Sequence, residues 1–496
     1  MSENNYKSID FLIKPTNREL YDYCENSCLL AKNLYNTGNY YIRQLMSGLK
    51  KDTDKRFKNE QEVIDTVENN IDTINQLRKD YLKKRLENET DIKKIRDLDY
   101  KLKHFENWTA PTADKWYINY NLLEAVFKVT KNEDYNALPG QVNQQILREL
   151  NKTWKGFFKA LERFKKHPAE FTGMPKPPKY IEIDKHTCTF TNVICKLKEI
   201  DGLTYLTFPK TDIKLSLGKY LSKDTKFQQV KIVPYYNNYK IILLIKDKKF
   251  SPVEKDSKRI LGIDPGLNNF ATISNNIGIA PIIIKGGVIK SRNQYYNKRK
   301  AQLQSCLPEG QYTSKQINSL GMRRDLFFND YFYKMAHSII CYAQSNDIDT
   351  IVMGHNKEQK QNINTGKINN QNFVSVPFAR FRDILSYLCL KNDIKYILQE
   401  ESYSSKASFL DNDIIPVYSK NDSTSYHFSG TRCKRGLYKS SSGILLNADV
   451  NGASNIIRKA FPSSFADITD LSYLYETVLE LNVFSVTGDS GCVSQP

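Results

Sequence analysis

Two aspartates lie where their carboxylates could act together. Asp264 ends the apolar run Leu261-Gly-Ile-Asp, and Asp449 lies in Asn447-Ala-Asp-Val-Asn451. Each has an ordinary structural interpretation, because aspartate often closes a turn or caps a helix. A charged side chain at the end of an apolar strand is nevertheless unusual, and carboxylates are preferred ligands of hard divalent cations. Together the two aspartates predict two corners of a metal-binding site.

Hydrophobic periodicity predicts the elements that must position these acids. Around Asp264, apolar residues alternate as in a strand, and the apolar pattern resumes at Phe270 after a Pro-Gly turn. After Asp449, Ala453, Ile456 and Ile457 recur at helical spacing. We therefore expect Asp264 at the end of a strand and Asp449 at the N-terminal end of an amphipathic helix.

The composition favours a polyanionic partner. The chain has 496 residues, enough for two or three domains. Its net charge of +18 suits a nucleic acid, because each neutralised phosphate releases counterions. A basic protein without such a partner is the alternative. The 31 tyrosines and 24 phenylalanines could stack on bases, although most aromatic residues fill cores.

Two broad classes of protein are disfavoured. No stretch approaches about 18 consecutive apolar residues, and the N-terminus lacks the apolar segment of a signal peptide. The nine cysteines form no Cys-x-x-Cys pair, so we expect reduced thiols. Cys24 and Cys28 are interpreted as buried small hydrophobic residues. The pattern predicts an intracellular protein without a membrane span.

The chain divides into parts with different periodicity. A short apolar segment and a helix come first, followed at about 50–165 by a charged, helically periodic part with little proline or glycine. A proline-rich break at 174–179 leads into short β-patterned runs. From about 257 strands alternate with helices, as in an α/β domain. The strands predicted in this last part are 260–263, 270–274, 281–289, 350–353 and 395–399.

These blocks resemble those of a known family, the transposon-encoded RNA-guided nuclease TnpB, also called OrfB, with its relatives the Fanzor proteins and the miniature type V CRISPR effectors. Gly262-Ile-Asp-Pro-Gly266 resembles the first motif of their RuvC domain, and Asn447-Ala-Asp-Val-Asn451 resembles the third. The segment 401–411 resembles the Tyr-Thr-Ser block, and 138–145 followed by 157–158 resembles an upstream helical element. The resemblance spans roughly 130–462 and rests mainly on the order of the blocks.

The resemblance implies a multidomain α+β protein. Its parts would be an N-terminal wedge-like β-barrel, a helical recognition lobe and a C-terminal RNase H-like (RuvC) α/β nuclease domain. The implied bounds are 1–48 with 170–256 for the wedge, 49–169 for the lobe, 257–402 with 445–465 for the nuclease domain, 403–444 for a target-nucleic-acid-binding insertion and 466–496 for a flexible tail.

The chain departs from the family at the second acid of the RuvC site. Relatives commonly carry a glutamate at the end of the fourth strand, where this chain has Gly354. The neighbouring strand ends in Glu400 and Glu401, and some lineages of the family use a relocated glutamate. Because side chains alternate along a strand, at most one of the pair should bind metal directly. We favour Glu401, together with Asp264 and Asp449, although a solvated strand end would also explain an acidic pair.

A second departure concerns zinc. Many relatives carry a four-cysteine zinc ribbon before the third motif, but this chain has only Cys433 there, so we expect no structural zinc. The segment is basic instead, and Arg435 is a candidate clamp for the scissile phosphate. Further candidate nucleic-acid-binding residues are Arg323, Arg324, Arg432, Lys434 and Lys439. For all of them the alternative is a solvated surface with weak contacts.

The main hypothesis is a TnpB-like RNA-guided DNA endonuclease. By resemblance, it would bind a guide RNA derived from its transposon end and cut double-stranded target DNA beside a short adjacent motif. The implied chemistry uses two Mg²⁺ ions about 4 Å apart. We expect a monomer on one RNA in the bacterial cytoplasm, associated with the nucleoid. The alternatives are a nuclease-dead RNA-guided repressor, which Gly354 favours, and a CRISPR-associated miniature effector.

Overall fold

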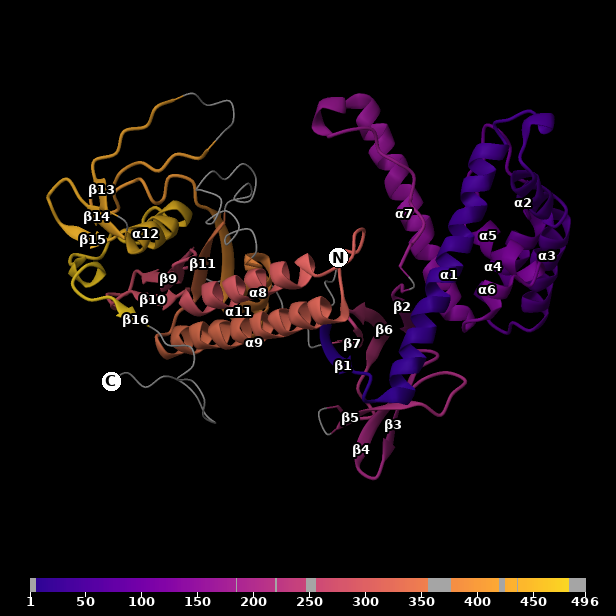
Figure 1. The fold of residues 1–496 in the computed structure, drawn as a ribbon, viewed down its shortest axis with the longest axis horizontal. Coiled ribbons are helices and arrows are strands. Elements are labelled where there is room, and N and C mark those ends of the chain that lie inside the picture. The colour runs from indigo at the N-terminus through magenta and orange to yellow at the C-terminus, as the bar shows by residue number, and fades with distance from the viewer. Residues whose placement is uncertain are drawn as a thin grey trace. The chain divides into compact units, whose positions relative to one another are not determined.

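The computed structural model describes residues 6–183, 185–218, 221–246, 256–355, 376–418, 424–434 and 436–480. The chain forms two compact units, Met1–Lys248 and Lys249–Pro496 (Figure 1). Both contain helices and sheets, so the predicted mixed α+β, multidomain character is confirmed at that level. In the part of the chain that the structure describes, no helix is long and apolar enough to cross a membrane.

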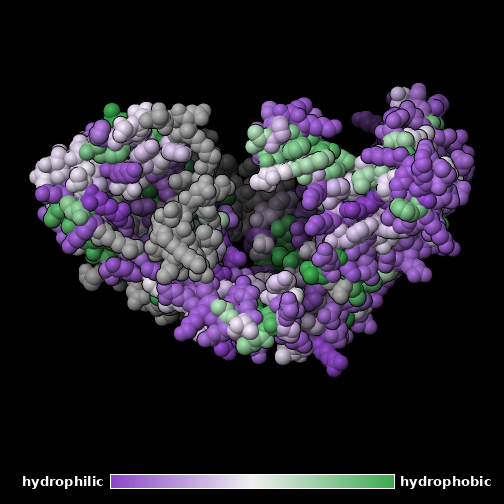
Figure 2. Space-filling view, turned by 45° about the horizontal axis from the view of Figure 1, so that its top comes forward, coloured by the Kyte–Doolittle hydropathy of each residue, from purple (hydrophilic) through white to green (hydrophobic). Residues whose placement is uncertain are grey.

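Unit 1 contains seven α-helices in its described residues. They are α1 (Arg18–Gly48), α2 (Lys58–Glu68), α3 (Ile71–Glu87), α4 (Ile92–Lys103), α5 (Tyr120–Val129), α6 (Glu133–Asn136) and α7 (Gly140–Lys166), with short 3-10 helices at Thr53–Lys55 and Pro168–Glu170. The face of the helical part drawn in Figure 2 is mostly hydrophilic, in keeping with its charged sequence. The apolar stripes of α1 and α7 face inward, where Trp154 is fully buried and its Nε1 donates to Asn39 Oδ1 at 3.0 Å.

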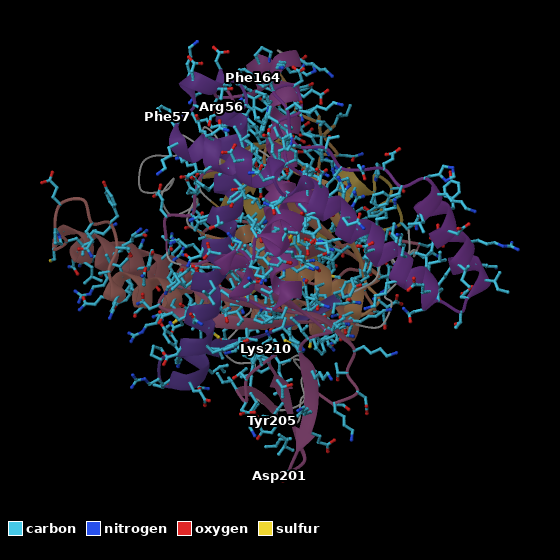
Figure 3. The ribbon with its side chains drawn as sticks, turned by 90° about the vertical axis from the view of Figure 1, so that its right-hand side faces the viewer. Arg56, Phe57, Phe164, Asp201, Tyr205 and Lys210 are labelled. Carbon is cyan, nitrogen blue, oxygen red and sulfur yellow. The ribbon has the colours of Figure 1, made fainter. Side chains whose placement is uncertain are left out.

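The β-rich part of unit 1 forms two antiparallel sheets. Strands β1 (Tyr6–Ile13), β7 (Asn238–Lys246), β6 (Phe227–Tyr235) and β2 (Cys188–Thr191) lie in the order β1-β7-β6-β2. Strands β3 (Lys196–Ile200), β4 (Leu203–Thr207) and β5 (Lys214–Gly218) form the second sheet, with Asp201 at its tip (Figure 3). Whether the two sheets constitute the predicted barrel stays a prediction.

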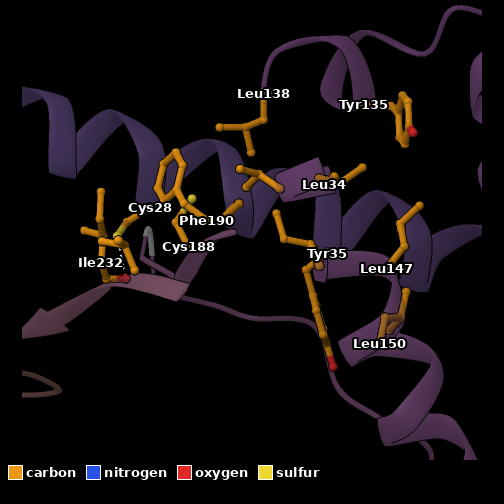
Figure 4. Close-up of a cluster of buried hydrophobic side chains, with 14 of the residues drawn as sticks. Cys28, Leu34, Tyr35, Tyr135, Leu138, Leu147, Leu150, Cys188, Phe190 and Ile232 are labelled. Carbon is orange, nitrogen blue, oxygen red and sulfur yellow. Dashed lines mark hydrogen bonds between the residues drawn. The ribbon is translucent and has the colours of Figure 1, made fainter. Parts of the chain in front are cut away.

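The core of unit 1 joins the first sheet to α1. Cys24 and Cys28 are completely buried, as expected for small hydrophobic residues, and Cys28 Sγ donates to the carbonyl oxygen of Ile232 at 3.8 Å (Figure 4). Cys188 and Phe190 of β2 pack into the same cluster. Burial raises the pKa of the Cys28 thiol to about 12, so this thiol stays protonated.

Unit 2 is built on a six-stranded mixed sheet. Its strands are β8 (Ile260–Pro265), β9 (Asn269–Asn275), β10 (Ile282–Lys285), β11 (Thr350–His355), β12 (Lys395–Glu400) and β16 (Leu479–Glu480), in the order β12-β11-β8-β9-β10-β16. The β8-β9-β10 meander is antiparallel, whereas β11 runs parallel to both β8 and β12. The carboxyl ends of β8, β11 and β12 therefore meet at one edge of the sheet.

Helices cover both faces of this sheet. Helices α8 (Gly287–Ser305) and α9 (Lys315–Ser345) precede β11, α11 (Phe378–Lys391) precedes β12, and α12 (Ala448–Ala460) follows the last motif. Leu261 and Ile263 of β8 share a core with α9 and α11, whereas Ile260 packs with Ile456 and Ile457 of α12. Period-2 alternation thus sends the even-numbered residues of β8, including Asp264, toward the α12 side.

One predicted strand was too long. The run 281–289 was expected as a single strand, but β10 ends at Lys285 and α8 begins at Gly287. The chain turns at Gly286, whose amide donates to the carbonyl oxygen of Asn268 at 2.6 Å. A side chain at Gly286 would collide with the carbonyl oxygen of Leu267, so this close approach requires glycine.

Two smaller elements complete unit 2. Strands β13 (Thr431–Lys434), β14 (Leu437–Lys439) and β15 (Leu445–Asn447) form a small antiparallel sheet that leads directly into α12. Within the segment assigned to a tail, residues up to 480 include a 3-10 helix at Ser472–Leu474 and the strand β16. Leu474 is fully buried against Phe409 and Val450, so this part of the segment packs on unit 2.

Candidate active site

Asp264 lies at the carboxyl end of β8 and faces α12. A Cβ atom built on Gly452 of α12 would lie 2.6 Å from Asp264 Oδ2. Glycine at position 452 is therefore what lets the first turn of the helix approach the carboxylate. Asp264 pairs with Thr272 in the β8-β9 register, which fixes its backbone by sheet hydrogen bonds.

Asp449 lies in the first turn of α12, as predicted, but it does not cap the helix. The N-cap is Asn447, whose Oδ1 accepts from the amides of Asp449 at 2.9 Å and of Val450 at 3.4 Å. The Asp449 carboxylate is therefore available for other partners. Its Oδ2 accepts from Asn269 Nδ2 at 2.7 Å, and Arg432 Nη2 lies 3.9 Å from Oδ1.

The structure separates the two adjacent glutamates. Glu400 accepts hydrogen bonds from the backbone amide and hydroxyl of Ser402, and from Lys459 Nζ at 2.5 Å. The Lys459 side chain is only 6% exposed. Burial raises the pKa of Glu400, but the hydrogen bonds from Lys459 and Ser402 outweigh it and leave the pKa below its usual value. Glu400 is thus held as a structural carboxylate.

Glu401 points to the space beside Gly354. Its Oε2 lies so close to Gly354 that a Cβ atom there would collide with it. The carboxylate of Glu401 therefore lies next to the position that the family resemblance predicts for the second acid. Burial raises the pKa of Glu401 to about 7, and the charge of Glu400 adds to the rise, while Arg382 and Lys459 oppose it.

The three carboxylates interact electrostatically. Burial raises the pKa of Asp264 well above its usual value, and the charges of Glu401 and Asp449 raise it further, while Arg432 lowers it. We call Asp264, Glu401 and Asp449 the acid cluster. A carboxylate whose pKa is raised by like charges is stabilised by any nearby cation.

The acid cluster has the chemistry of a divalent-cation site. Its donors are all carboxylate oxygens, which Mg²⁺ prefers, and glycines at 354 and 452 leave room beside two of the three carboxylates. Among the described residues, however, no group of three or more His, Cys, Asp or Glu side chains is already arranged as a metal cage. Asp449 is instead turned toward Asn269 and Arg432. The donor set fits the ion, and binding requires the side chains to close around it.

The basic residues predicted from the sequence fall into different surroundings. Arg432 lies beside Asp449, whereas the sequence suggested Arg435 as the candidate phosphate clamp. Arg435 itself lies outside the described residues. Lys434 and Lys439 are exposed on the small sheet. The register of this hairpin includes an irregularity between Arg432 and Lys434, so the sequence alone could not indicate which side chain faces the acids.

The two arginines of α9 differ in exposure. Arg323 is exposed. Arg324 is packed, because its Nε donates to Asn293 Oδ1 at 2.9 Å and its guanidinium lies 4.9 Å from the ring centroid of Tyr296 and 4.8 Å from that of Phe328. Arg324 therefore joins α8 to α9 instead of presenting its charge to solvent.

The geometry defines a mixed α+β protein with an acid cluster at the carboxyl edge of the six-stranded sheet of unit 2. Comparison with known proteins finds two partial family matches. Residues 241–360 match the OrfB_IS605 family model, described as a probable transposase. Residues 378–456 match the Cas12f1-like TNB domain. Both matches agree with the motifs, and the predicted resemblance to the TnpB family is confirmed. No match was found among curated proteins.

Solved structures of CRISPR effectors are similar to the chain. A Cas12f1–sgRNA–target DNA complex has a TM-score of 0.45 and 11% identity, covering 91% of this chain and 98% of that chain. A CRISPR-Cas12f ternary complex gives 0.29 and 12%, covering 81% and 82%. A Cas12i–crRNA–dsDNA complex gives 0.31 and 9%, covering 75% and 55%. Because all three TM-scores are below 0.5, these similarities do not assign the fold.

Proposed function

We propose that this protein is an RNA-guided DNA endonuclease with a RuvC-type active site. The observation that carries the proposal is the convergence of Asp264, Glu401 and Asp449 from three separate chain segments. The relationship to TnpB- and Cas12f-type RNA-guided nucleases supports it. The order of the strands supports it too, because β10-β9-β8-β11-β12, with β10-β9-β8 antiparallel and β8-β11-β12 parallel, is the arrangement of an RNase H-like sheet.

In the proposed mechanism Asp264, Glu401 and Asp449 would hold two Mg²⁺ ions. Bound Mg²⁺ would supply an activated water and neutralise charge on the scissile phosphodiester. Asn269 orients Asp449 by its 2.7 Å hydrogen bond, and Arg432 would bind a phosphate oxygen, with Arg435 as a second candidate clamp. We propose nucleic-acid contacts for Arg323, Lys434 and Lys439, with target choice left to base pairing with a transposon-derived guide RNA.

We also propose the domain assignment that the family resemblance implies. Unit 1 would contain the wedge, 1–48 with 170–256, and the recognition lobe, 49–169. Unit 2 would contain the nuclease domain, 257–402 with 445–465, and the target-nucleic-acid-binding insertion, 403–444. The unit boundary at Lys248/Lys249 lies close to the proposed junction and supports this division. The expectation of no structural zinc stays a prediction.

The second candidate function is a nuclease-dead RNA-guided repressor. Gly354 favoured it at the level of sequence. The structure gives a specific reason to prefer the active enzyme, because the carboxylate of Glu401 occupies the space that Gly354 leaves open. A CRISPR-associated effector would have the same chemistry and differ in its genomic neighbours.

Plasmid cleavage tests the proposal. The protein is purified with RNA from its native locus and given a plasmid library with randomised adjacent sequences and Mg²⁺. Asp264→Ala and Glu401→Ala should each lower cleavage by about 10³-fold or more, since each removes several kcal/mol of transition-state stabilisation. Glu400→Gln, whose amide oxygen can still accept from Ser402 although the ion pair with Lys459 is lost, is the matched control and should still cleave. Guided binding without cleavage by the wild type would favour the repressor.

A further inference from the structure

Glu401 lies beyond the regular sheet. The last pair in the register of β11 and β12 is His355 with Glu400, so the regular pairing of the two strands ends one residue before Glu401. The chain then enters a compact turn in which Tyr403 has a positive φ of 62°. A relocated acid at this place needs another means of orientation, because a ligand on an irregular segment is held less firmly than one on a strand.

Three side chains of α12 bind the main chain of the segment that follows Glu401. Asn451 Nδ2 donates to the Ala407 carbonyl at 2.8 Å, and its Oδ1 accepts from the Phe409 amide at 2.9 Å. Asn455 Nδ2 donates to the carbonyls of Ser404 at 2.8 Å and Ala407 at 2.7 Å.

Arg458 extends this row by almost one helical turn. Its Nη1 donates to Asn412 Oδ1 and its Nη2 to the Asp413 carbonyl, each at 2.6 Å. We call Asn451, Asn455 and Arg458 the polar ladder. They are 0%, 0% and 9% exposed. Burying polar groups costs free energy unless they are hydrogen-bonded, so their place on a buried helix face indicates a positional role.

The same helix fixes the other two acids. Asp449 lies in its first turn, and Asp264 packs against Gly452. The ladder adds Glu401 to this set by holding 404–413 to the helix. One rigid element is thus in contact with all three segments that carry the acid cluster, at spacings fixed by the helical repeat.

We propose that Asn451, Asn455 and Arg458 are positioning residues that set the carboxylate of Glu401 for metal binding. This rests on the proposed function, since it concerns the same metal site. Groups that orient metal ligands typically contribute 10–100-fold to metal affinity or activity, so about that loss is expected when one ladder bond is removed.

The test measures Mn²⁺ binding by isothermal titration calorimetry to the RNA-free full chain, so it does not depend on cleavage. Asn455→Ala should weaken Mn²⁺ binding about 10-fold or more, and Arg458→Lys should weaken it less. Ser454→Ala is the matched control. It lies on the same helix, is fully buried, and loses a 2.7 Å contact to Ser274 on the sheet instead of a contact to the turn.

The outcomes separate the two proposals. A loss of Mn²⁺ affinity in Asn455→Ala but not in Ser454→Ala, at equal thermal stability, supports the ladder. Equal Mn²⁺ affinity in Asn455→Ala and the wild type overturns the ladder and leaves the nuclease proposal intact, as does an equal loss in both variants. A wild type that binds no Mn²⁺ overturns both. If the variants are less stable, hydrogen exchange of a peptide covering 401–413 keeps the comparison interpretable. The amides of this peptide should exchange faster in Asn455→Ala than in the wild type.

Discussion

Replacing Glu401 by glutamine should stabilise the metal-free protein, by an amount that grows above pH 4.5 and is complete above about pH 7. The pKa of Glu401 is raised from 4.5 to about 7 in the folded state. Below pH 4.5 the side chain is protonated in both the folded and the unfolded state, so it has no effect. Between pH 4.5 and 7 the unfolded chain loses its proton first, and the stability of the folded state falls. Glutamine removes this penalty because it cannot ionise.

The magnitude follows from the pKa. A rise from 4.5 to about 7 corresponds to about 3 kcal/mol at roughly 1.4 kcal/mol per pKa unit, as an upper value. Glu401→Gln should therefore be more stable than the wild type by up to about 3 kcal/mol at pH 8, and equal to it at pH 4.5. For a unit of this size that is a melting-temperature increase of roughly 6–12 °C.

Urea unfolding in EDTA at both pH values measures the effect. All three tryptophans (Trp108, Trp116 and Trp154) lie in unit 1, so tryptophan fluorescence reports that unit, while circular dichroism reports both. Only the circular dichroism transition should change. Glu400→Gln is a control of opposite sign. Because the pKa of Glu400 is lowered in the folded state, the ionised side chain stabilises the fold at pH values above its ordinary pKa. The Glu400→Gln variant should therefore be less stable than the wild type at pH 8. A Glu401→Gln variant with the same stability difference at both pH values would refute the reasoning.

Three further predictions concern the same edge of unit 2. Arg432→Ala should lower the cleavage rate roughly 10–100-fold, since a charge-assisted hydrogen bond contributes about 1.5–3 kcal/mol. Single-turnover rates would show whether Arg432→Lys restores part of the lost cleavage rate. Gly354→Glu alone should lower Mn²⁺ affinity, because its side chain collides with Glu401, whereas Gly354→Glu with Glu401→Ala should bind Mn²⁺ more tightly than Glu401→Ala alone. The double variant Lys434→Ala, Lys439→Ala should bind DNA with a weaker salt dependence. The slope of log affinity against log salt concentration, measured by fluorescence anisotropy, should fall by roughly one unit per lost phosphate contact. An unchanged slope would show that neither lysine contacts the DNA.

The sequence predicted the elements that carry the acids because their signals are local. Alternation of Leu261 and Ile263 with polar or small residues specified a strand ending at Asp264, and β8 has that form. Helical spacing after Asp449 specified α12. Alternation also limited the Glu400–Glu401 pair to one metal ligand. It could not select between them, because the selection depends on Lys459, 59 positions away from Glu400 in the sequence.

The polar ladder shows why the remainder was not predictable. Asn451, Asn455 and Arg458 recur on one side of α12, opposite the apolar residues that identified the helix. By the usual rule this polar side should face solvent. It is buried instead, because 404–413 lies over it and supplies mainly main-chain partners for its hydrogen bonds, which carry no side-chain signal.

Moving an acid from a strand to the turn beyond its neighbour has a physical consequence. At position 354 a glutamate would lie within β11, where the residue is paired with Gln399 of β12. At position 401 the carboxylate reaches the same space only if glycine is at 354 and if the turn after Glu401 is held in place. The relocation therefore links three local features, Gly354, Glu401 and the buried polar side of α12. We expect them to change together, because a glutamate at 354 would remove the need for both the glycine and the ladder.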